Sequence, residues 1–128
     1  MKATYTVTLA VLAGVVVGIA AVQGLHAQTK PLVYFIAVKE LSDPVGYKKE
    51  YGPLARKSIK SHGGQILAAG NSTVIAGEPL KGRVIVLAWD NMEQLRGWFN
   101  SPDYRKIRKI GEKYARSRYY FSVPGVNK

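Results

Sequence analysis

The chain of 128 residues contains no cysteine and only two histidines. Without cysteine it can form no disulfide, zinc-thiolate site or iron–sulfur cluster, and it has no thiol nucleophile. The two histidines, His26 and His62, are too few for the multi-ligand sites typical of zinc and non-haem iron. Stability must therefore come from an apolar core, and we expect no bound metal or other cofactor.

Acidic residues are also scarce, since 8 Asp and Glu stand against 19 Lys and Arg, for a net charge of +11. The three aspartates stand at expected helix starts, where a carboxylate caps the helix or complements its dipole. They are Asp43, Asp90 and Asp103. No paired-carboxylate site and no GxSxG, Walker or Rossmann motif is present. The sequence therefore identifies no catalytic residue and leaves open whether the protein is an enzyme.

Residues 1–27 have the pattern of an export signal. A positive start at Lys2 is followed by an uncharged apolar run at residues 7–22, and Ala27 precedes a polar residue. The run is short for a membrane span, which needs about 20 apolar residues. We expect cleavage near Ala27 and a periplasmic or secreted mature chain, with an uncleaved anchor as the alternative.

Residues 28–128 are long enough for one domain with one core. Apolar runs rich in β-branched and aromatic residues predict strands. These are residues 32–38, 65–69, 83–89 and 118–123, with a β-like continuation at residues 72–76. Two amphipathic helical segments separate the strands. The resulting βαββαβ order is typical of an α+β, ferredoxin-like fold with an antiparallel sheet.

Capping and breaking residues predict where the helices begin and end. Asp43-Pro44 should start the first helix, and His62-Gly63-Gly64 should end it. Gly52-Pro53 should kink that helix, because proline has no N–H to donate. Asp90 is the expected N-cap of the second helix, which Ser101-Pro102 should restart.

The predicted first and third strands are apolar on both faces, yet the chain has helices for only one face of the sheet. The other face needs a second layer. A homodimer that packs two such sheets face to face would supply it.

Several short motifs of the chain are similar to those of one protein family. They are Asp43-Pro44 with Tyr47 and Tyr51, His62-Gly63-Gly64, Gly77-Glu78 with Arg83, Trp98, and Asn100-Ser101-Pro102 with Tyr104. This set resembles the domain of unknown function number 1330, within the dimeric α/β-barrel superfamily. The resemblance covers about residues 33–125 and implies a dimeric barrel, but it implies no established reaction. The superfamily includes cofactor-free monooxygenases, isomerases and ligand-sensing domains, so the fold carries little functional weight.

The chain departs from the family pattern at three positions. Many members carry arginine, glutamate and arginine where Ala69, Ala88 and Gly111 stand here. If those polar groups form a site in such members, this chain has lost that site.

The aromatic residues of the predicted helices supply the candidate ligand site. Tyr47, Tyr51, Trp98 and Tyr104 fall on the inward stripes of helices that meet one sheet face. Core packing and a small-molecule cleft both suit such residues. If a ligand binds, we expect His62 near one end of the cleft and Arg108 as the contact for an anionic group. The alternative for His62 is an interaction with the last carbonyls of its helix.

Three functional classes remain open, and the sequence names no ligand, reaction or pathway. The first is binding of a small organic molecule, and molecules that carry a carboxylate belong to this class. The second is a cofactor-free enzyme of the monooxygenase or isomerase kind. The third is an envelope-associated protein whose basic C-terminal part, residues 105–118, holds an anionic surface. The export signal argues against a nucleic-acid partner.

Overall fold

The computed structural model describes residues 30–127, with a compact unit at Leu32–Gly125. The predicted export signal, residues 1–27, lies outside the described residues. Within them, no helix combines the length and the apolar character that crossing a membrane requires.

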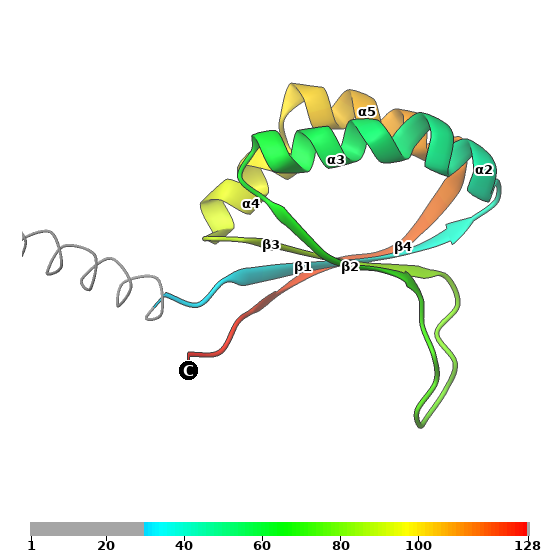
Figure 1. The fold of residues 1–128 in the computed structure, drawn as a ribbon, viewed down its shortest axis with the longest axis horizontal. Helices are drawn as coiled ribbons and strands as arrows, with labels where there is room; N and C mark the ends of the chain where they lie inside the picture. Colours follow the sequence, from blue (N-terminus) through cyan, green and yellow to red (C-terminus); the bar gives the residue numbers. More distant parts are fainter. Residues whose placement is uncertain (1–29, 128) are drawn as a thin grey trace, which may run out of the picture. The chain divides into compact units, whose positions relative to one another are not determined.

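The compact unit is one antiparallel sheet with its helices on one face (Figure 1). The strands are β1 (Val33–Leu41), β2 (Gln65–Asn71), β3 (Arg83–Trp89) and β4 (Ala115–Pro124), in the order β2-β3-β1-β4. The helical segments are α2 (Pro44–Gly46), the π-helical turn η1 (Tyr47–Tyr51), α3 (Gly52–Ser61), α4 (Met92–Phe99) and α5 (Pro102–Glu112). This arrangement confirms the predicted α+β ferredoxin-like fold.

Side-chain caps start the helices, as predicted at two positions. Asp43 Oδ1 accepts a hydrogen bond from the Gly46 N–H at 3.0 Å, and Ser101 Oγ accepts one from the Tyr104 N–H at 3.3 Å. The prediction of Asp90 as a cap was wrong. Asn91 caps α4 instead, accepting the Gln94 N–H at 2.8 Å, because the extended backbone reaches one residue further before the helix begins.

The predicted strand continuation at residues 72–76 was also wrong. In the register of the β2–β3 pair, Asn71 lies opposite Arg83, which is the first residue of β3. A strand that continued past Asn71 would have no partner, so residues 72–82 form a loop that extends beyond the sheet (Figure 1).

The break predicted at Gly52-Pro53 takes the form of a π-helical turn. Pro53 has no N–H for the carbonyl four residues earlier, and the Gly52 N–H bonds to the Tyr47 carbonyl, five residues back. The extra residue in this turn changes which side chains of the following helix α3 face the core. Leu54 lies three residues after the buried Tyr51 and is nevertheless 42% exposed.

The core lies between the helices and one face of the sheet. Trp89, Trp98 and Tyr104 are its largest fully buried side chains, and the ring of Phe35 meets that of Trp98 edge-on at 5.6 Å between centroids. The other face of the sheet carries exposed apolar side chains. They include Tyr119, Phe121 and Val123 of β4.

Candidate functional site

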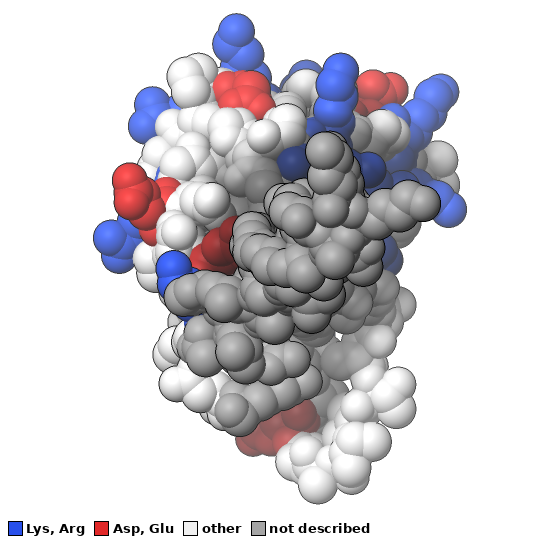
Figure 2. All heavy atoms as spheres, turned by 60° about the vertical axis from the view of Figure 1, so that its left-hand side comes forward, with Lys and Arg blue, Asp and Glu red and all other residues white. Residues whose placement is uncertain are grey.

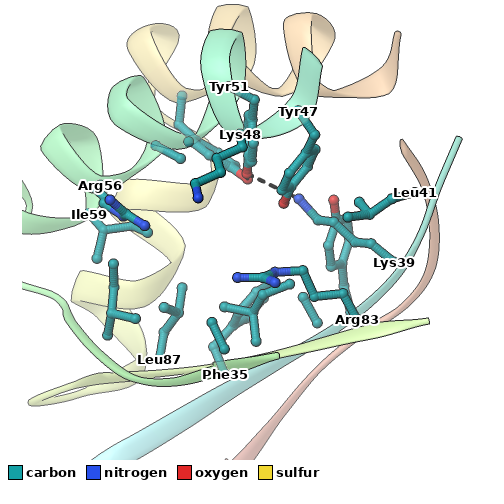
Figure 3. Close-up of a pocket in the computed structure, with 18 of the residues that line it drawn as sticks. Phe35, Lys39, Leu41, Tyr47, Lys48, Tyr51, Arg56, Ile59, Arg83 and Leu87 are labelled. Carbon is teal, nitrogen blue, oxygen red and sulfur yellow. Dashed lines mark hydrogen bonds between the residues drawn. The ribbon is translucent and has the colours of Figure 1, made fainter. Parts of the chain in front are cut away.

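A cavity of about 400 Å³ lies between the sheet and the helical segment formed by η1 and α3 (Figure 3). Its volume falls within the range of small-molecule pockets. The apolar part of its lining comes from β1, β3 and α3, and includes Phe35, Ala55, Ile59 and Leu87. Tyr47, Tyr51, Trp98, Tyr104 and Tyr120 supply aromatic surface.

Lys39 is the buried cation of this cavity. Phe35, Ala37 and Lys39 alternate along β1, so the lysine faces the helices together with the core residues. It is only 5% exposed. Its Nζ donates a hydrogen bond to the Tyr51 hydroxyl at 3.1 Å and lies 4.3 Å from the centroid of the Tyr51 ring (Figure 3). Cation–π attraction and one hydrogen bond thus hold the amine.

The tyrosine that receives this hydrogen bond belongs to a buried pair. The hydroxyls of Tyr51 and Tyr104 lie 2.6 Å apart. Burial is the main cause that raises the pKa of Tyr51 and of Tyr104 above the usual value, and it raises that of Tyr47 to about 12. All three phenols therefore stay protonated near neutral pH and can donate hydrogen bonds.

The environment of Lys39 disfavours its charged form. Its pKa is lowered from 10.5 to about 8, mainly by burial and to a lesser extent by Arg108, whereas Glu112 acts in the opposite direction. Among the described residues no carboxylate pairs with this amine, since the only ion pairs there join His62 to Asp103 and Arg118 to Glu40. A buried cation without a counter-ion lowers the stability of the fold, so an anion bound beside Lys39 would be stabilised more than elsewhere in the cavity.

Three further cations line the cavity: Lys48, Arg56 and Arg83. Figure 3 shows Lys48 and Arg56 on the helical side, with Lys48 beside Tyr51, and Arg83 on the sheet side, next to Lys39, its partner in the β1–β3 register. Among the described residues, the lining contains neither Asp nor Glu. The cavity is therefore positive throughout, and it combines this charge with aromatic walls.

The structure brings four of the six predicted site residues to this cavity. Tyr47, Tyr51, Trp98 and Tyr104 all line it. The fully buried Trp98 also packs on Tyr104, with ring centroids 4.1 Å apart, so these aromatic side chains are core and cavity wall at once.

His62 and Arg108 lie outside the cavity lining. The His62 Nε2 lies 3.1 Å from Asp103 Oδ1 instead of meeting the last carbonyls of α3, because the start of α5 packs beside the end of α3. The Arg108 guanidinium stacks on Phe99, 4.2 Å from the ring centroid, so it caps the core from outside.

Ser58, Asp103 and His62 form a polar cluster that sequence reasoning did not find. Ser58 Oγ donates to Asp103 Oδ2 at 2.9 Å, and His62 contacts the other carboxylate oxygen. The carboxylate stands between the hydroxyl and the imidazole, so the imidazole cannot act as base on Ser58. Ser101 most strongly, then Ser58 and His62, hold the pKa of Asp103 below its usual range. The cluster joins α3 to α5 and does not form a nucleophile.

Lys39 is the other residue that sequence reasoning missed. The first strand was predicted as residues 32–38, so Lys39 fell just outside it. The alternation of Phe35, Ala37 and Lys39 contained the relevant signal, because every second residue of a strand shares a face.

Solved structures share this fold at low sequence identity. A protein of unknown function from Rhodopseudomonas palustris matches with a TM-score of 0.59 and 12% identity, over 85% of this chain and 93% of the other. SnoaB, a cofactor-independent oxygenase from Streptomyces nogalater, matches with a TM-score of 0.54 and 11% identity, over 77% and 96%. A protein from Bacteroides thetaiotaomicron, described as a possible oxidoreductase, matches with a TM-score of 0.51 and 13% identity, over 75% and 99%. These similarities establish the fold alone.

Sequence comparison identifies the family without supplying a function. No curated protein shows significant similarity to the chain. The family described as "Domain of unknown function (DUF1330)" matches residues 32–126. Of the three positions at which the sequence is expected to depart from the family pattern, Ala69 lines the cavity, and Gly111 lies outside the lining but packs against the Tyr51 ring. The chain thus belongs to the DUF1330 family.

Proposed function

We propose that the protein binds a small organic anion in the cavity between the sheet and the η1–α3 segment. One observation carries this proposal: the Lys39 amine is buried in the cavity wall and has no carboxylate partner among the described residues. An anionic ligand would provide the missing counter-charge. The aromatic walls suit a flat, partly apolar ligand, and a carboxylate is the simplest anionic group for this mixture of Lys and Arg.

The energetics favour an anion over a neutral ligand. Leaving one partner of a buried ion pair alone typically costs about 3–5 kcal/mol. The Tyr51 ring and hydroxyl offset part of that cost, since a desolvated cation–π contact contributes about 2 kcal/mol. A carboxylate would offset more of it, and Arg83 and Arg56 would also attract it into the cavity.

A titration with matched acids and amides tests this proposal. 2-Naphthoate and 2-naphthamide have the same aromatic body and differ in charge, so calorimetry on the same protein separates charge from shape. We expect the acid to bind at least ten-fold more tightly. Lys39→Met should remove this preference, and Lys109→Met, a change on the exposed surface of α5, should leave it intact. Equal affinities for the acid and the amide would contradict the proposal.

A cofactor-free enzyme acting on a substrate in the same cavity is the second candidate function. The lowered pKa of Lys39 favours it, because an amine with a pKa of about 8 can accept a proton near neutral pH. The fold shared with SnoaB is compatible with this candidate and adds only an analogy. Turnover of bound acids, lost in Lys39→Met, would distinguish catalysis from binding.

We also propose that the protein acts as an exported homodimer. The apolar side chains of β4 on the face away from the helices support the dimer, because monomers rarely expose a contiguous apolar patch. The uncharged run at residues 7–22 supports export.

Contact with an anionic envelope surface is a further candidate role. It would use the basic face of the helical layer, where Figure 2 shows Lys and Arg side chains with fewer Asp and Glu among them. Exposed members of this face include Arg105, Lys106, Lys109 and Lys113. Sedimentation of the protein with phosphatidylglycerol vesicles tests this role.

A further inference from the structure

We propose that the Lys39 amine forms an imine with a small organic acid that also carries an aldehyde or ketone group. This inference rests on the proposed binding of an organic anion in the same cavity, and it adds a covalent step and a substrate class, the oxo acids. The observations behind it are the position of Nζ in the cavity wall, the phenols around it and the other cations of the lining.

The surroundings of Nζ suit a nucleophilic amine. The Nζ lies 4.3 Å from the centroid of the Tyr51 ring, 5.4 Å from that of Tyr47 and 5.8 Å from that of Tyr120. These rings replace water around the amine, and a desolvated lysine is a common activated nucleophile. With a pKa of about 8, roughly a tenth of the amine is uncharged at pH 7. The uncharged form is the one that attacks a carbonyl carbon.

The charged and titratable groups around the amine come from several elements, and of these Arg108 lowers and Glu112 raises the pKa of Lys39. Tyr51 and Tyr47 lie on η1, Arg108 and Glu112 on α5, Tyr120 on β4 and Arg83 on β3. The nearest proton donor or acceptor is the Tyr51 hydroxyl, at 3.1 Å from Nζ. The Tyr104 hydroxyl lies 2.6 Å from the Tyr51 hydroxyl and so continues this hydrogen-bonded series.

The step balances without any oxidant or reductant. The nitrogen lone pair attacks the carbonyl carbon, the C=O π bond opens, and a proton passes from nitrogen to the new alkoxide to give a carbinolamine. A second proton, from the Tyr51 hydroxyl, lets that hydroxyl leave as water while the nitrogen lone pair forms the C=N bond, and the last proton on nitrogen then returns to the Tyr51 oxygen. The Tyr51–Tyr104 pair is placed to pass these protons, because both phenols stay protonated in the resting protein. The products are the imine and one water molecule.

The arginines of the cavity determine the substrate class: Arg83 pairs with Lys39 in the β1–β3 register, and Arg56 lies on the helical side, away from Lys39 (Figure 3). Once Lys39 is consumed as the imine, the acid group needs another positive partner. Arg83 and Arg56 can bind a carboxylate with two parallel hydrogen bonds, which Lys48 cannot. A substrate with its carbonyl and its carboxylate at opposite ends would contact both sides of the cavity, so an aromatic aldehyde acid is a suitable probe.

Reductive trapping on the intact protein tests the inference. The protein is incubated with 4-carboxybenzaldehyde and sodium cyanoborohydride, which reduces an imine to a stable secondary amine, and modified lysines are located by peptide mass spectrometry. We expect Lys39 to be labelled at least ten-fold faster than exposed lysines such as Lys57, Lys106 and Lys109. Lys39→Arg keeps the positive charge and should lose the fast label, whereas Lys109→Arg should keep it. Because the wild-type map needs no variant, a failure of Lys39→Arg to fold does not remove the test.

The probes separate this inference from the proposed function. Terephthalate has the two acid groups without the aldehyde, and benzaldehyde has the aldehyde without the acid. If terephthalate binds and 4-carboxybenzaldehyde labels Lys39 no faster than exposed lysines, the imine is ruled out while anion binding stands. If benzaldehyde labels Lys39 as fast as the carboxylated aldehyde does, the amine is reactive and the oxo-acid assignment is wrong. If no probe binds and labelling is even over all lysines, both proposals are wrong.

Discussion

The hydroxyl groups of Tyr51 and Tyr104 lie 2.6 Å apart, although 53 positions separate the two residues in the chain. This contact joins η1 to α5 directly above the buried amine of Lys39. One face of the cavity is therefore held by a hydrogen-bonded chain of amine, phenol and phenol. Changes in any member should alter both stability and the chemistry of the cavity.

Tyr104→Phe should lower the free energy of unfolding by about 0.5–1.5 kcal/mol, the usual contribution of a hydrogen bond. The Tyr51 hydroxyl keeps its contact with Lys39, so the fold should survive. Urea unfolding followed by circular dichroism measures the loss. Tyr114→Phe is the matched control, because its hydroxyl makes no side-chain hydrogen bond in the described part of the chain. Equal losses in the two variants would show that the Tyr51–Tyr104 contact contributes nothing.

Lys39→Met should stabilise the free protein at pH 7 and abolish binding of acids. The folded state lowers the pKa of Lys39 from 10.5 to about 8, so burying the charge costs stability below pH 8. That cost disappears as pH rises from 8 towards 10.5, since the folded state then releases its proton before the unfolded state does. We expect a gain of roughly 2–3 kcal/mol at pH 7, the scale of the pKa shift, and little gain at pH 10.

Urea unfolding of Lys39→Met and wild type at the two pH values checks this expectation. Lys109→Met, on the exposed surface of α5, should show no pH-dependent difference. A gain that stays constant between pH 7 and pH 10 would mean that the buried charge is not its source.

Gly111→Ala should destabilise the protein by about 1–3 kcal/mol, the usual cost of overpacking. A Cβ at Gly111 would lie 2.9 Å from Cδ2 of Tyr51, so the ring that carries the hydrogen-bonded chain must move. The control is Gly97→Ala in α4, where a Cβ meets nothing within 4 Å. That change should stabilise the helix by about 0.5–1 kcal/mol. Thermal unfolding of both variants gives the comparison, and the same sign for both would contradict it.

Phe121→Asp should separate the proposed dimer. Phe121 is 46% exposed on the sheet face away from the helices, and a charge there would be buried between two sheets. Sedimentation velocity should show a dimer for the wild type and a monomer, or an unfolded chain, for the variant. Gln94→Asp adds the same charge on the exposed surface of α4 and should remain dimeric. A wild type that sediments as a monomer at micromolar concentration would remove the proposal.

Most of the fold could be predicted from the sequence because local signals agreed with each other. The apolar runs at β1 and β3, the caps at Asp43 and Ser101 and the C-terminal glycine after α3 all occur as expected, and Gly63 takes a φ of +83°. The exceptions depend on neighbours that the sequence does not show. Residues 72–76 have strand-like composition but no strand to pair with. The N-cap of α4 is Asn91, one residue after the predicted Asp90.

The candidate site was only partly predictable because its chemistry depends on burial. Helical spacing was enough to group Tyr47, Tyr51, Trp98 and Tyr104, since aromatic stripes face the core. The sequence predicted Arg108 as the cation that contacts an anionic ligand, because it follows Tyr104 by one helical turn. The structure places Arg108 on Phe99 and puts Lys39 into the cavity. The alternation of Phe35, Ala37 and Lys39 predicts which face of the strand carries the lysine, but whether that lysine is buried depends on how the helices pack over this face.

The π-helical turn at η1 makes the cavity sensitive to chain length. A single residue makes the difference between this turn and a continuous α-helix, and each residue turns a helix by about 100°. Loss of Lys49 or Glu50 would therefore rotate Tyr47 relative to α3 and away from Tyr51, whose ring it now meets at 4.7 Å between centroids. A deletion could thus abolish the site in a relative that retains every side chain that lines it.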